Sequence, residues 1–413
     1  MEKMTYDILD SGPRNRFCVN GRIVHNCIGA GPQPTNLPNS AGVFAMECES
    51  CGRHYGTHRK DCPWCGASAE LAHKIEWGIE SAEFALESIA TQSLVFVEYV
   101  WGDAMLAVSG SLRALFIAAP GHDLICSDYS AIEAVVIAEL AGEQWRKDVF
   151  NTHGKIYEMS ASMVTGIPLD DILKFKEETG KHHPTRKQGK VMELACAYGG
   201  FVGSMQAFGA DEFMSEQEMK DAVLSWRKAS PAIVEMWGGQ QRNWKTEYYG
   251  VEGMAILAIS NPGAVFEYRG LKFQRRGDVF YIRLLSGREM AYHRPLLRPS
   301  ERRQGTYSIS YEGWNSNPKN GPMGWIRMDT YGPRLVENVV QATARDLQWH
   351  GILALEAAGY PVVLHVYDED AAEVPEGWGS VEEFETIMST MPDWAAGWPV
   401  RAKGGWRGKR YRK

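Results

Sequence analysis

Three carboxylates occupy positions from which they could bind metal ions. Asp128 ends an expected buried strand at residues 123–128, and Asp368 and Glu369 follow the expected strand at residues 361–366. A carboxylate at the end of a buried strand has few structural reasons to be there. If Asp128 and Asp368 come together, their like charges repel unless divalent cations with oxygen ligands lie between them. Two such ions about 3.5 to 4 Å apart can stabilise the attacking and leaving oxygens of phosphoryl transfer, although a lone acidic pair is more often solvated surface.

A second group of candidate residues follows helical spacing. Arg186, Lys190, Leu194 and Tyr198 recur every four residues, and steps of four advance about 40° around a helix, so they form one stripe. Two cations, an apolar residue and an aromatic ring suit a nucleotide, with the triphosphate at one end and the base at the other. A salt-bridged surface is the alternative for such a basic stripe. Gly199-Gly200 predicts the end of this helix.

Four of the eight cysteines form two Cys-x-x-Cys pairs. Each pair lets two thiolates converge on one tetrahedral ion, and the glycine that follows each pair permits a tight turn. Four thiolates leave no open coordination position, so a structural role is favoured over a catalytic one, and a redox pair is the weaker alternative. The spacing predicts a Zn²⁺ site at Cys48, Cys51, Cys62 and Cys65.

The N-terminal segment combines a hairpin pattern with a reactive triplet. Asn20-Gly21 follows the expected strand at residues 16–19 and is a strong two-residue hairpin signal. His25 is placed to polarise the carbonyl of Asn26, whose side-chain amide can then attack that carbonyl. Cys27, on the far side of the same peptide bond, is a nucleophile that accepts acyl groups. The segment is therefore predicted to be poised for cleavage, and an ordinary hairpin is the alternative.

Mixed helical and strand patterns are expected to position these groups. Apolar periodicity distinguishes the helices from the strands, and helical spacing resumes at about Ile75. Ser286-Gly287 predicts a turn between two strands. The expected elements are a strand at 123–128, a helix at 131–140, a helix at 186–198, strands between 266 and 298, a helix at 336–358 and a hairpin at 361–374 with carboxylates at its tip. The pattern predicts an α/β (α+β) enzyme.

Composition limits the class of protein. The 413 residues suggest two to three structural units, and 44% apolar with 23% charged residues exclude a wholly disordered, collagen-like or coiled-coil chain. No run of 18 uncharged apolar residues occurs, and no basic-then-apolar leader follows Met1. We therefore expect a cytoplasmic protein without membrane contact.

The charge distribution is uneven. The net charge of −7 argues mildly against a surface covered with phosphate-binding groups, but an acidic total can hide a basic groove. Residues 181–190 are basic, and residues 401–413 carry seven Lys or Arg. For this tail, a solvated terminus is at least as reasonable an interpretation as a phosphate contact.

Residues 1–27 resemble the C-terminal splicing motifs of inteins. The resemblance rests on Tyr6-Asp-Ile and on the run from Phe17 through Asn-Gly-x-Ile-Val-His-Asn to Cys. It implies that Asn26 cyclises, His25 assists, Asp7 tunes the steps and Cys27 begins the retained product. Asn15 stands where such segments often carry histidine. Because no N-terminal splicing block precedes it, the segment looks like the C-terminal half of a split intein.

The rest of the chain resembles the polymerase domain of family A DNA polymerases, particularly the phage forms. The motifs are Gln-Pro-Thr-Asn-Leu-Pro at residues 33–38, Arg-Ala-Leu-Phe-Ile-Ala at 113–118, Asp-Tyr-Ser-Ala-Ile-Glu at 128–133, Arg-x3-Lys-x7-Tyr-Gly-Gly at 186–200, Gln-Ala-Thr-Ala-Arg-Asp at 341–346 and Tyr-Asp-Glu at 367–369. The resemblance implies a right-hand palm with an antiparallel sheet, together with fingers. It also implies dNTP and primer-template DNA as partners.

The resemblance also implies roles for individual residues. Asp128 and Asp368 would hold two Mg²⁺ ions with help from the backbone of Tyr129, and Glu369 would belong to the catalytic group. Lys190 would be the proton donor to pyrophosphate. The implied nucleotide contacts are Arg186, Lys190, Leu194, Tyr198 and Glu133, of which Glu133 excludes the ribose 2′-hydroxyl and Tyr198 lies under the template base. The implied DNA contacts are Gln341, Arg113 and Arg345.

Three departures from the family pattern leave the metal ligands intact. Tyr367 replaces the usual histidine, Val135 stands where arginine is common, and Leu194 fills a position where many relatives have Phe or Tyr. They affect the expected primer-end contacts and nucleotide selectivity rather than the reaction type.

The resemblances together predict the domain organisation and a partner. We expect a split-intein fragment at residues 1–26, the start of the retained polymerase segment at 27–47, a zinc-ribbon insert at 48–66, and palm and fingers at 67–413 with fingers near 145–260. A separate N-terminal half would supply the thumb and be joined at Cys27 by trans-splicing. The alternatives are an inactive DNA-binding remnant and a single-subunit RNA polymerase, which an acidic residue at Glu133 disfavours.

Overall fold

The structure is a computed structural model that describes residues 16–19, 22–25, 44–239, 247–300, 306–315 and 321–411. It divides into two compact units. The first combines residues up to Ser130 with His350–Thr390 and Arg401–Lys413, and the second combines Ala131–Trp349 with Met391–Val400. All strand pairs among the described residues are antiparallel, so the predicted mixed α/β class with antiparallel sheets is confirmed.

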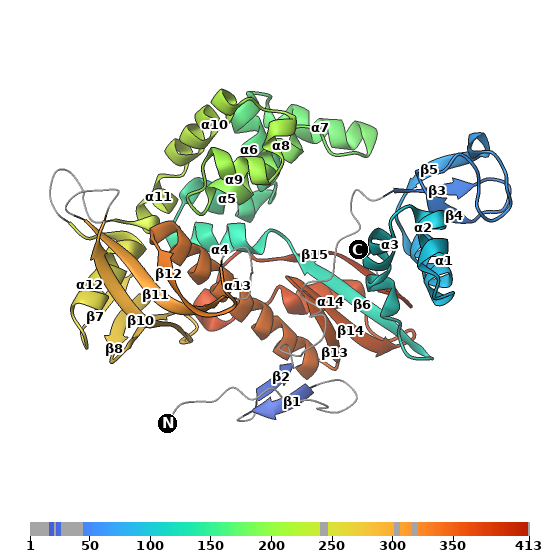
Figure 1. Ribbon diagram of the computed structural model, residues 1–413. Helices are drawn as coiled ribbons and strands as arrows, with labels where there is room; N and C mark the ends of the chain where they lie inside the picture. The colour runs from blue at the N-terminus through green and yellow to red at the C-terminus, as the bar shows by residue number, and fades with distance from the viewer. Residues whose placement is uncertain are drawn as a thin grey trace. The chain divides into compact units, whose positions relative to one another are not determined.

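A four-stranded sheet forms the centre of the first unit (Figure 1). The strand predicted at residues 123–128 is β6, and α14 packs on it and on β15. Alternate residues of β6 and its neighbours bury a small core that includes Leu124, Cys126 and Ala371. The strands lie in the order β13 (Val362–Val366), β14 (Glu369–Pro375), β6 (His122–Tyr129) and β15 (Ala402–Gly408), with α14 at Val381–Met388.

A smaller module precedes this sheet in the chain. Its three strands lie in the order β4-β3-β5, and three helices bury the apolar side chains of Tyr55, Val100 and Trp101 against them. The elements are β3 (Phe44–Cys48), β4 (His54–Gly56), η2 (Ala69–Leu71), β5 (Ala72–Glu76), α1 (Ile79–Ala90), α2 (Leu94–Trp101), α3 (Ala104–Ser111) and η3 (Arg113–Leu115). The helical start predicted near Ile75 is wrong, because Ile75 pairs with Ala45 inside β5 and the first helix begins at Ile79.

The hairpin predicted around Asn20-Gly21 is confirmed. β1 (Arg16–Val19) and β2 (Arg22–His25) pair antiparallel, and Val19 lies opposite Arg22. The other predicted features of the N-terminal segment, including Asp7, Asn15, Asn26 and Cys27, lie outside the described residues.

Helices make up the first part of the second unit. A buried ion pair between Arg146 and Glu193 lies in their core, and the indole of Trp226 donates to Glu193 Oε1 at 3.1 Å. Because a buried charge is costly without partners, this network fixes how the helices pack. The helices that precede the strands are α4 (Ile132–Ala141), α5 (Gln144–Thr152), α6 (Ile156–Thr165), α7 (Leu169–Thr179), α8 (Arg186–Cys196), α9 (Val202–Ala207), η4 (Ala210–Glu212), α10 (Glu216–Ala229), α11 (Pro231–Trp237) and α12 (Gly250–Ser260). The long helix α13 (Gly332–Ala357) follows the strands, and its residues from His350 on belong to the first unit.

A six-stranded meander completes the second unit. It confirms the strands predicted between residues 266 and 298, and the turn at Ser286-Gly287 lies between β9 and β10. One face buries Phe273 and Ile282, and α12 packs on the first four strands. The strands are β7 (Val265–Tyr268), β8 (Leu271–Arg276), β9 (Val279–Arg283), β10 (Glu289–Pro299), β11 (Tyr307–Asn315) and β12 (Gly324–Thr330).

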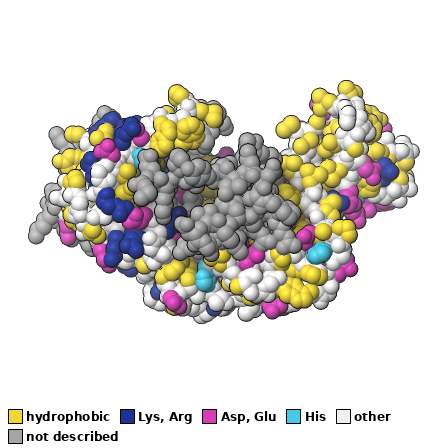
Figure 2. Space-filling view, turned by 90° about the horizontal axis from the view of Figure 1, so that it is seen from below, with side chains coloured by type: hydrophobic (Ala, Val, Ile, Leu, Met, Phe, Trp, Pro, Cys, Tyr) yellow, Lys and Arg dark blue, Asp and Glu magenta, His cyan; other side chains and the backbone are white. Residues whose placement is uncertain are grey.

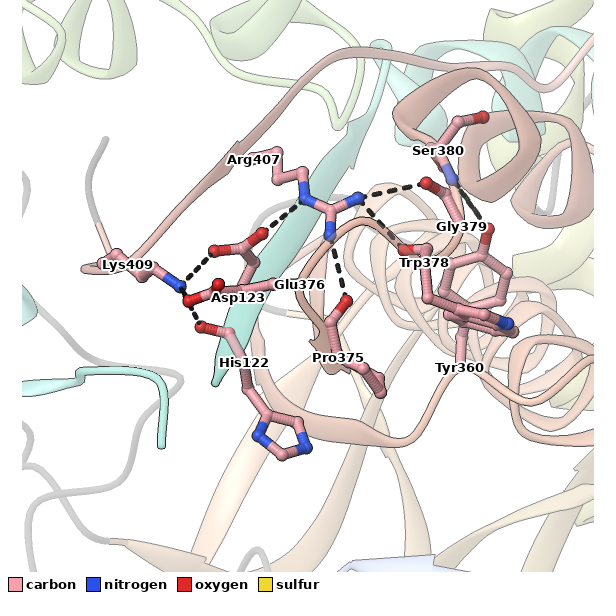
Figure 3. A network of polar contacts seen from close by, with 10 residues as sticks. All are labelled: His122, Asp123, Tyr360, Pro375, Glu376, Trp378, Gly379, Ser380, Arg407 and Lys409. Atoms are coloured by element: carbon pink, nitrogen blue, oxygen red, sulfur yellow. Dashed lines mark hydrogen bonds and ion pairs between the residues drawn. The ribbon is translucent and has the colours of Figure 1, made fainter. Parts of the chain in front are cut away.

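The basic C-terminal tail is part of the fold. Lys403 pairs with Asp128 and Arg407 with Ile125, so β15 is a strand of the central sheet rather than a solvated terminus. Figure 3 shows how Arg407 and Lys409 converge on Asp123: Arg407 Nε lies 2.7 Å and Lys409 Nζ 2.8 Å from its carboxylate oxygens. Arg407 also donates to the carbonyls of Pro375, Trp378 and Gly379. Arg407 and Lys409 therefore already have anionic and carbonyl partners within the protein.

The ion pairs of Asp123 predict a pH dependence of stability. Lys409 and then Arg407 hold the pKa of Asp123 below its ordinary value of 3.8. The folded chain thus releases the Asp123 proton more readily than the unfolded chain. The ion pairs stabilise the folded chain fully above the unfolded-state pKa, and this stabilisation is lost as the pH falls through the lower pKa of the folded state. Asp123→Asn should lower the free energy of unfolding at pH 7 by about 1 kcal/mol and show less of a difference near pH 3. Urea unfolding at both pH values measures this, with Asp211→Asn as a control, and an equal loss at both would contradict it.

No helix in the described parts of the chain combines the length and the apolar character needed to cross a bilayer.

Candidate functional site

The candidate site lies where β6 ends beside the turn between β13 and β14. Asp128 lies directly opposite Glu369 in the β6–β14 register. Tyr367 and Asp368 connect the strands, because Val366 pairs with Glu369. The two segments are also joined by the amide of Tyr129, which donates to the carbonyl of Asp368 at 3.1 Å. Asp128 and Asp368, the predicted acidic pair, therefore lie on adjacent backbone segments, and both are half-buried.

Two non-glycine residues beside these aspartates have left-handed backbone conformations. Tyr367 has φ 54° and Ala131 has φ 50°. Such conformations cost of order 1 kcal/mol and concentrate at functional sites, where the surrounding structure holds them in place. Tyr367 sets the turn that carries Asp368, and Ala131 starts the helix that follows Asp128. Both turns thus fix where the carboxylates emerge from the sheet.

Glu369 differs from the two aspartates in being almost fully buried. The hydroxyl of Tyr411 donates to Glu369 Oε2, and Arg113 Nη1 lies 3.8 Å from the same oxygen. Arg113 also donates to the Tyr411 hydroxyl at 2.8 Å. Burial, together with the charge of Glu369, raises the pKa of Tyr411 well above its ordinary value, so this phenol stays a donor. The network holds Glu369 directly opposite Asp128.

Arg113, which the resemblance assigned to a DNA or phosphate contact, is 6% exposed. Its guanidinium contacts Glu369 and Tyr411 in the interior of the first unit. The DNA contact stays a prediction, and the contacts found are those of a residue that positions Glu369.

The side chain of Tyr129 points into the core. Its hydroxyl donates to the carbonyl of Met388 at 3.0 Å, and burial followed by the charge of Asp370 raises its pKa well above the ordinary value. This orientation leaves the backbone of Tyr129 as the part that could act at the site. The sequence-based expectation also named the backbone.

A cavity of about 990 Å³ within the first unit reaches Asp128 and Glu369. Its volume is in the range of small-molecule sites. Lys403, Arg113 and Tyr411 line it from the side of the central sheet, and Glu47, His54, Trp77, Glu80 and Glu83 line it from the side of the smaller module.

The stripe predicted on the helix at residues 186–198 is an accessible face of α8. Lys190 and Leu194 are exposed, whereas the intervening Val191 and Met192 are buried. Arg186 Nε donates to Glu158 Oε1 at 2.8 Å. Lys190 has no ion-pair partner in the described part of the chain, so the salt-bridge alternative applies to one end of the stripe only. The prediction that this helix extends to residue 198 is wrong, because α8 ends at Cys196 and Gly199, with φ 76°, follows in a turn. Tyr198 therefore lies just beyond the helix, and the stripe on α8 consists of Arg186, Lys190 and Leu194.

Three further predicted residues meet in the second unit. The hydroxyl of Tyr198 donates to Glu133 Oε2 at 2.8 Å, and Gln341 on α13 also hydrogen-bonds Glu133. Burial raises the pKa of Glu133 above its ordinary value, and Glu337 adds to the rise, while the bonds from Tyr198 and Gln341 oppose it. Arg345, one turn further along α13, donates to Gln348 at 2.8 Å. Residues from three parts of the sequence thus form one polar group.

The four predicted metal-binding cysteines converge. Their sulfur atoms all lie within 4.8 Å of one another. Gly52 and Gly66 have φ 68° and 76°, and their amides donate to the carbonyls of Cys48 and Cys62. The glycines therefore make the tight turns expected of two knuckles, and the four-sulfur set fits Zn²⁺. That Zn²⁺ binds there is a prediction.

Metal analysis tests the cysteine site. Protein purified without chelator should contain about one zinc per chain, and Cys62→Ser should remove it and lower the melting temperature. Cys196→Ala is the matched control, because this buried cysteine lies on α8 outside the cluster. Zinc-free protein with four reactive thiols and an unchanged melting temperature would contradict the prediction.

Sequence reasoning missed Tyr411 and Lys403. Both come from the tail, whose strand pattern is interrupted by Gly404-Gly405 at the point where the β15 register shifts. The apolar Trp406 followed by the charged Arg407 was the part of the pattern that could have indicated a strand here.

Comparison with known proteins finds similarity to DNA polymerases. The DNA polymerase of Bacillus phage SP02 is 37% identical over 351 residues, which cover 85% of this chain and 50% of the phage protein. DNA polymerase I of Mycobacterium tuberculosis (strain H37Rv) is 32% identical over 129 residues, covering 31% of this chain and 12% of that protein. DNA polymerase I of Treponema pallidum is 27% identical over 124 residues, covering 30% of this chain and 11% of that protein. The chain is therefore related in sequence to DNA polymerases.

The POL domain of Pol1 from M. smegmatis, in complex with DNA primer-template and dNTP, has a TM-score of 0.44 at 19% identity, and the match covers 73% of this chain and 42% of that chain. No family model matches. The chain spans about half the length of the phage relative and about a tenth of the bacterial ones.

Proposed function

We propose that this chain supplies the catalytic part of a family A DNA polymerase, which adds dNTPs to a primer under the direction of a DNA template. The observation that carries the proposal is the pairing of the Asp128 strand end with the turn that holds Asp368. It occurs in a chain 37% identical to a phage DNA polymerase.

Asp128 and Asp368, with the backbone of Tyr129, would hold two Mg²⁺ ions. This set offers only oxygen ligands, which Mg²⁺ prefers. When bound, such ions neutralise charge on the attacking and leaving oxygens. The chain's own contribution is to fix both aspartates by strand pairing and to keep Glu369 in place through Tyr411 and Arg113. In this proposal Glu369 helps to position Asp128, its direct neighbour across the strands.

The exposed stripe on α8 would bind the incoming nucleotide. Lys190 is exposed without an ion-pair partner in the described residues, and its ammonium could contact the triphosphate and protonate the departing pyrophosphate. Arg186 would exchange its contact with Glu158 for a phosphate oxygen. Leu194 and Tyr198 would contact the sugar and the base, and Gln341 and Arg345 would contact DNA.

Glu133 would exclude ribonucleotides. Its carboxylate is held by Tyr198, so a 2′-hydroxyl would meet a large, fixed acidic group. Glu133→Ala should raise ribonucleotide incorporation relative to dNTP by about ten- to a hundredfold, as for other pockets that reject one added hydroxyl. Single-nucleotide insertion assays measure this ratio, and Glu139→Ala on the same helix is the control. A protein that prefers ribonucleotides before any substitution would instead be a single-subunit RNA polymerase.

The segment before Cys27 is proposed to be a split-intein fragment that is removed by trans-splicing. The described hairpin of β1 and β2 supports this, since His25 ends β2 directly before Asn26. Splicing would join the polymerase segment to a separate N-terminal half. The phage relative, about half of which this chain covers, is long enough to contain such a half.

Primer extension tests the function. The chain joined to its N-terminal half should extend a labelled primer on a DNA template with Mg²⁺ and dNTPs, and extension should stop when EDTA removes the metal. Joined protein that binds primer-template but never extends it would support the alternative of an inactive DNA-binding remnant.

A further inference from the structure

The β7–β12 sheet presents one face to solvent. The opposite face buries Leu271, Phe280 and Tyr292, as alternation along an antiparallel strand requires. The strand registers place the following side chains together on the exposed face: Lys272 and Arg276 on β8, Tyr281 and Arg283 on β9, His293 and Arg298 on β10, Trp314 on β11, and Trp325 and Arg327 on β12. We call this the aromatic–basic face.

Two tryptophans are the most unusual residues of this face. Trp314 and Trp325 lie directly opposite each other across β11 and β12, and they are 60% and 59% exposed. Their ring centroids are 6.4 Å apart in an edge-to-face arrangement, and the ring of His293 lies 5.5 Å from that of Trp325. Isolated exposed apolar side chains are common, but paired tryptophans with most of their surface in water indicate a binding surface.

The charge of the sheet is opposite to that of the whole chain. The described residues of this region, 265–300, 306–315 and 321–330, contain nine Lys or Arg and five Asp or Glu, a net charge of +4 in a chain of −7. Figure 2 shows Lys and Arg side chains gathered on the part of this view that the sheet forms. Such a local excess of positive charge favours polyanionic ligands.

Internal ion pairs neutralise only part of this positive charge. Arg276 contacts Glu289 at 2.5 Å. Arg294 and Arg327 share the single carboxylate of Glu312, with contacts of 2.7 and 3.0 Å. Lys272 and Arg283 are direct cross-strand neighbours, and each has a glutamate opposite it on its other side, Glu267 for Lys272 and Glu289 for Arg283. Lys272, Arg283 and Arg298 have no ion-pair partner among the residues that the structure describes.

We propose that the aromatic–basic face binds single-stranded nucleic acid. Trp314 and Trp325 would stack on unpaired bases, and Lys272, Arg283 and Arg298 would contact the phosphates. Aromatic rings beside a cationic track are how sheet surfaces hold single strands without reading sequence, because each base has a π-face. Stacking on the flat of a base requires that base to be unpaired, so a single strand is favoured over a duplex.

The binding of labelled oligonucleotides to the whole chain tests this proposal. We would measure the fluorescence anisotropy of a fluorescein-labelled oligo(dT) of about 20 nucleotides. Trp314→Ala combined with Trp325→Ala should weaken binding by about tenfold or more. Lys272→Gln combined with Arg283→Gln should weaken it and reduce the slope of log K against log salt by about 1 to 1.5. The matched controls are Phe208→Ala, and Lys174→Gln combined with Lys228→Gln.

Weaker oligo(dT) binding by both variants, with unchanged melting temperatures and normal binding by the controls, supports the proposal. Unchanged oligo(dT) binding by the tryptophan variant overturns it. Equal losses for oligo(dT), a duplex and polyglutamate would also overturn it, since the face would then be a general electrostatic surface. The assay needs no catalysis, so its failure would leave the polymerase proposal untouched.

Discussion

Asp128→Asn or Asp368→Asn should lower the rate of nucleotide addition by about a thousandfold or more, because each change removes an anionic ligand from the proposed metal site. Binding of primer-template should change only a few-fold, since it depends mainly on phosphate contacts. Single-turnover primer extension at saturating DNA separates the two quantities. Because both aspartates are half-buried, Asp128 near the end of β6 and Asp368 in the β13–β14 turn, the amides should fit without unfolding the sheet.

Asp123→Asn is the matched control for this experiment. It lies on the same strand as Asp128 but at the opposite end, where its carboxylate contacts Arg407 and Lys409. It should affect stability and leave the turnover of folded protein unchanged. Extension by the Asp128 and Asp368 variants within tenfold of the parent rate, at any Mg²⁺ concentration, would refute the two-metal proposal.

Asn26→Ala should abolish release of the N-terminal peptide. If the chain is mixed with its predicted N-terminal partner, splicing should release residues 1–26 and give a joined product beginning its second part at Cys27. Without the Asn26 side-chain amide, cyclisation has no nucleophile, and the reaction should stop at a branched intermediate attached at Cys27. Mass spectrometry of the intact proteins detects the released peptide, the branched form and the joined product.

Asn39→Ala is a suitable control, because it changes the same residue type beyond Cys27 and should splice normally. Two unchanged chain masses for the parent protein would show that the N-terminal segment is not a functional intein fragment. That result would not affect the polymerase site, which lies wholly beyond Cys27.

Local patterns were enough to predict the elements that carry the site. The apolar run before Asp128 and the hairpin around Asp368 became β6 and the β13–β14 connection, because buried strands and a tight turn are determined by neighbouring residues. The fourfold spacing on α8 likewise placed Lys190 and Leu194 on one accessible face. The spacing of the cysteines predicted their convergence.

Long-range partners could not be predicted from such patterns. Tyr411 holds Glu369 although 42 residues separate them. Arg113 donates to the Tyr411 hydroxyl from 298 residues away in the chain. The tail strand β15 was missed because Gly404 and Gly405 interrupt its alternation. The shared hydrogen bonds of Glu133 with Tyr198 and Gln341 depend equally on how three helical segments pack.

Asp128 and Asp368 are proposed to hold two divalent ions at the end of the central sheet. The most direct measurement is anomalous diffraction from crystals of the joined protein with Mn²⁺, a dideoxy-terminated primer-template and the next dNTP. We expect two Mn²⁺ peaks about 3.5 to 4 Å apart, each with an oxygen of Asp128 or Asp368 as a ligand. Peaks elsewhere, or a bound nucleotide with no metal at either aspartate, would contradict this proposal.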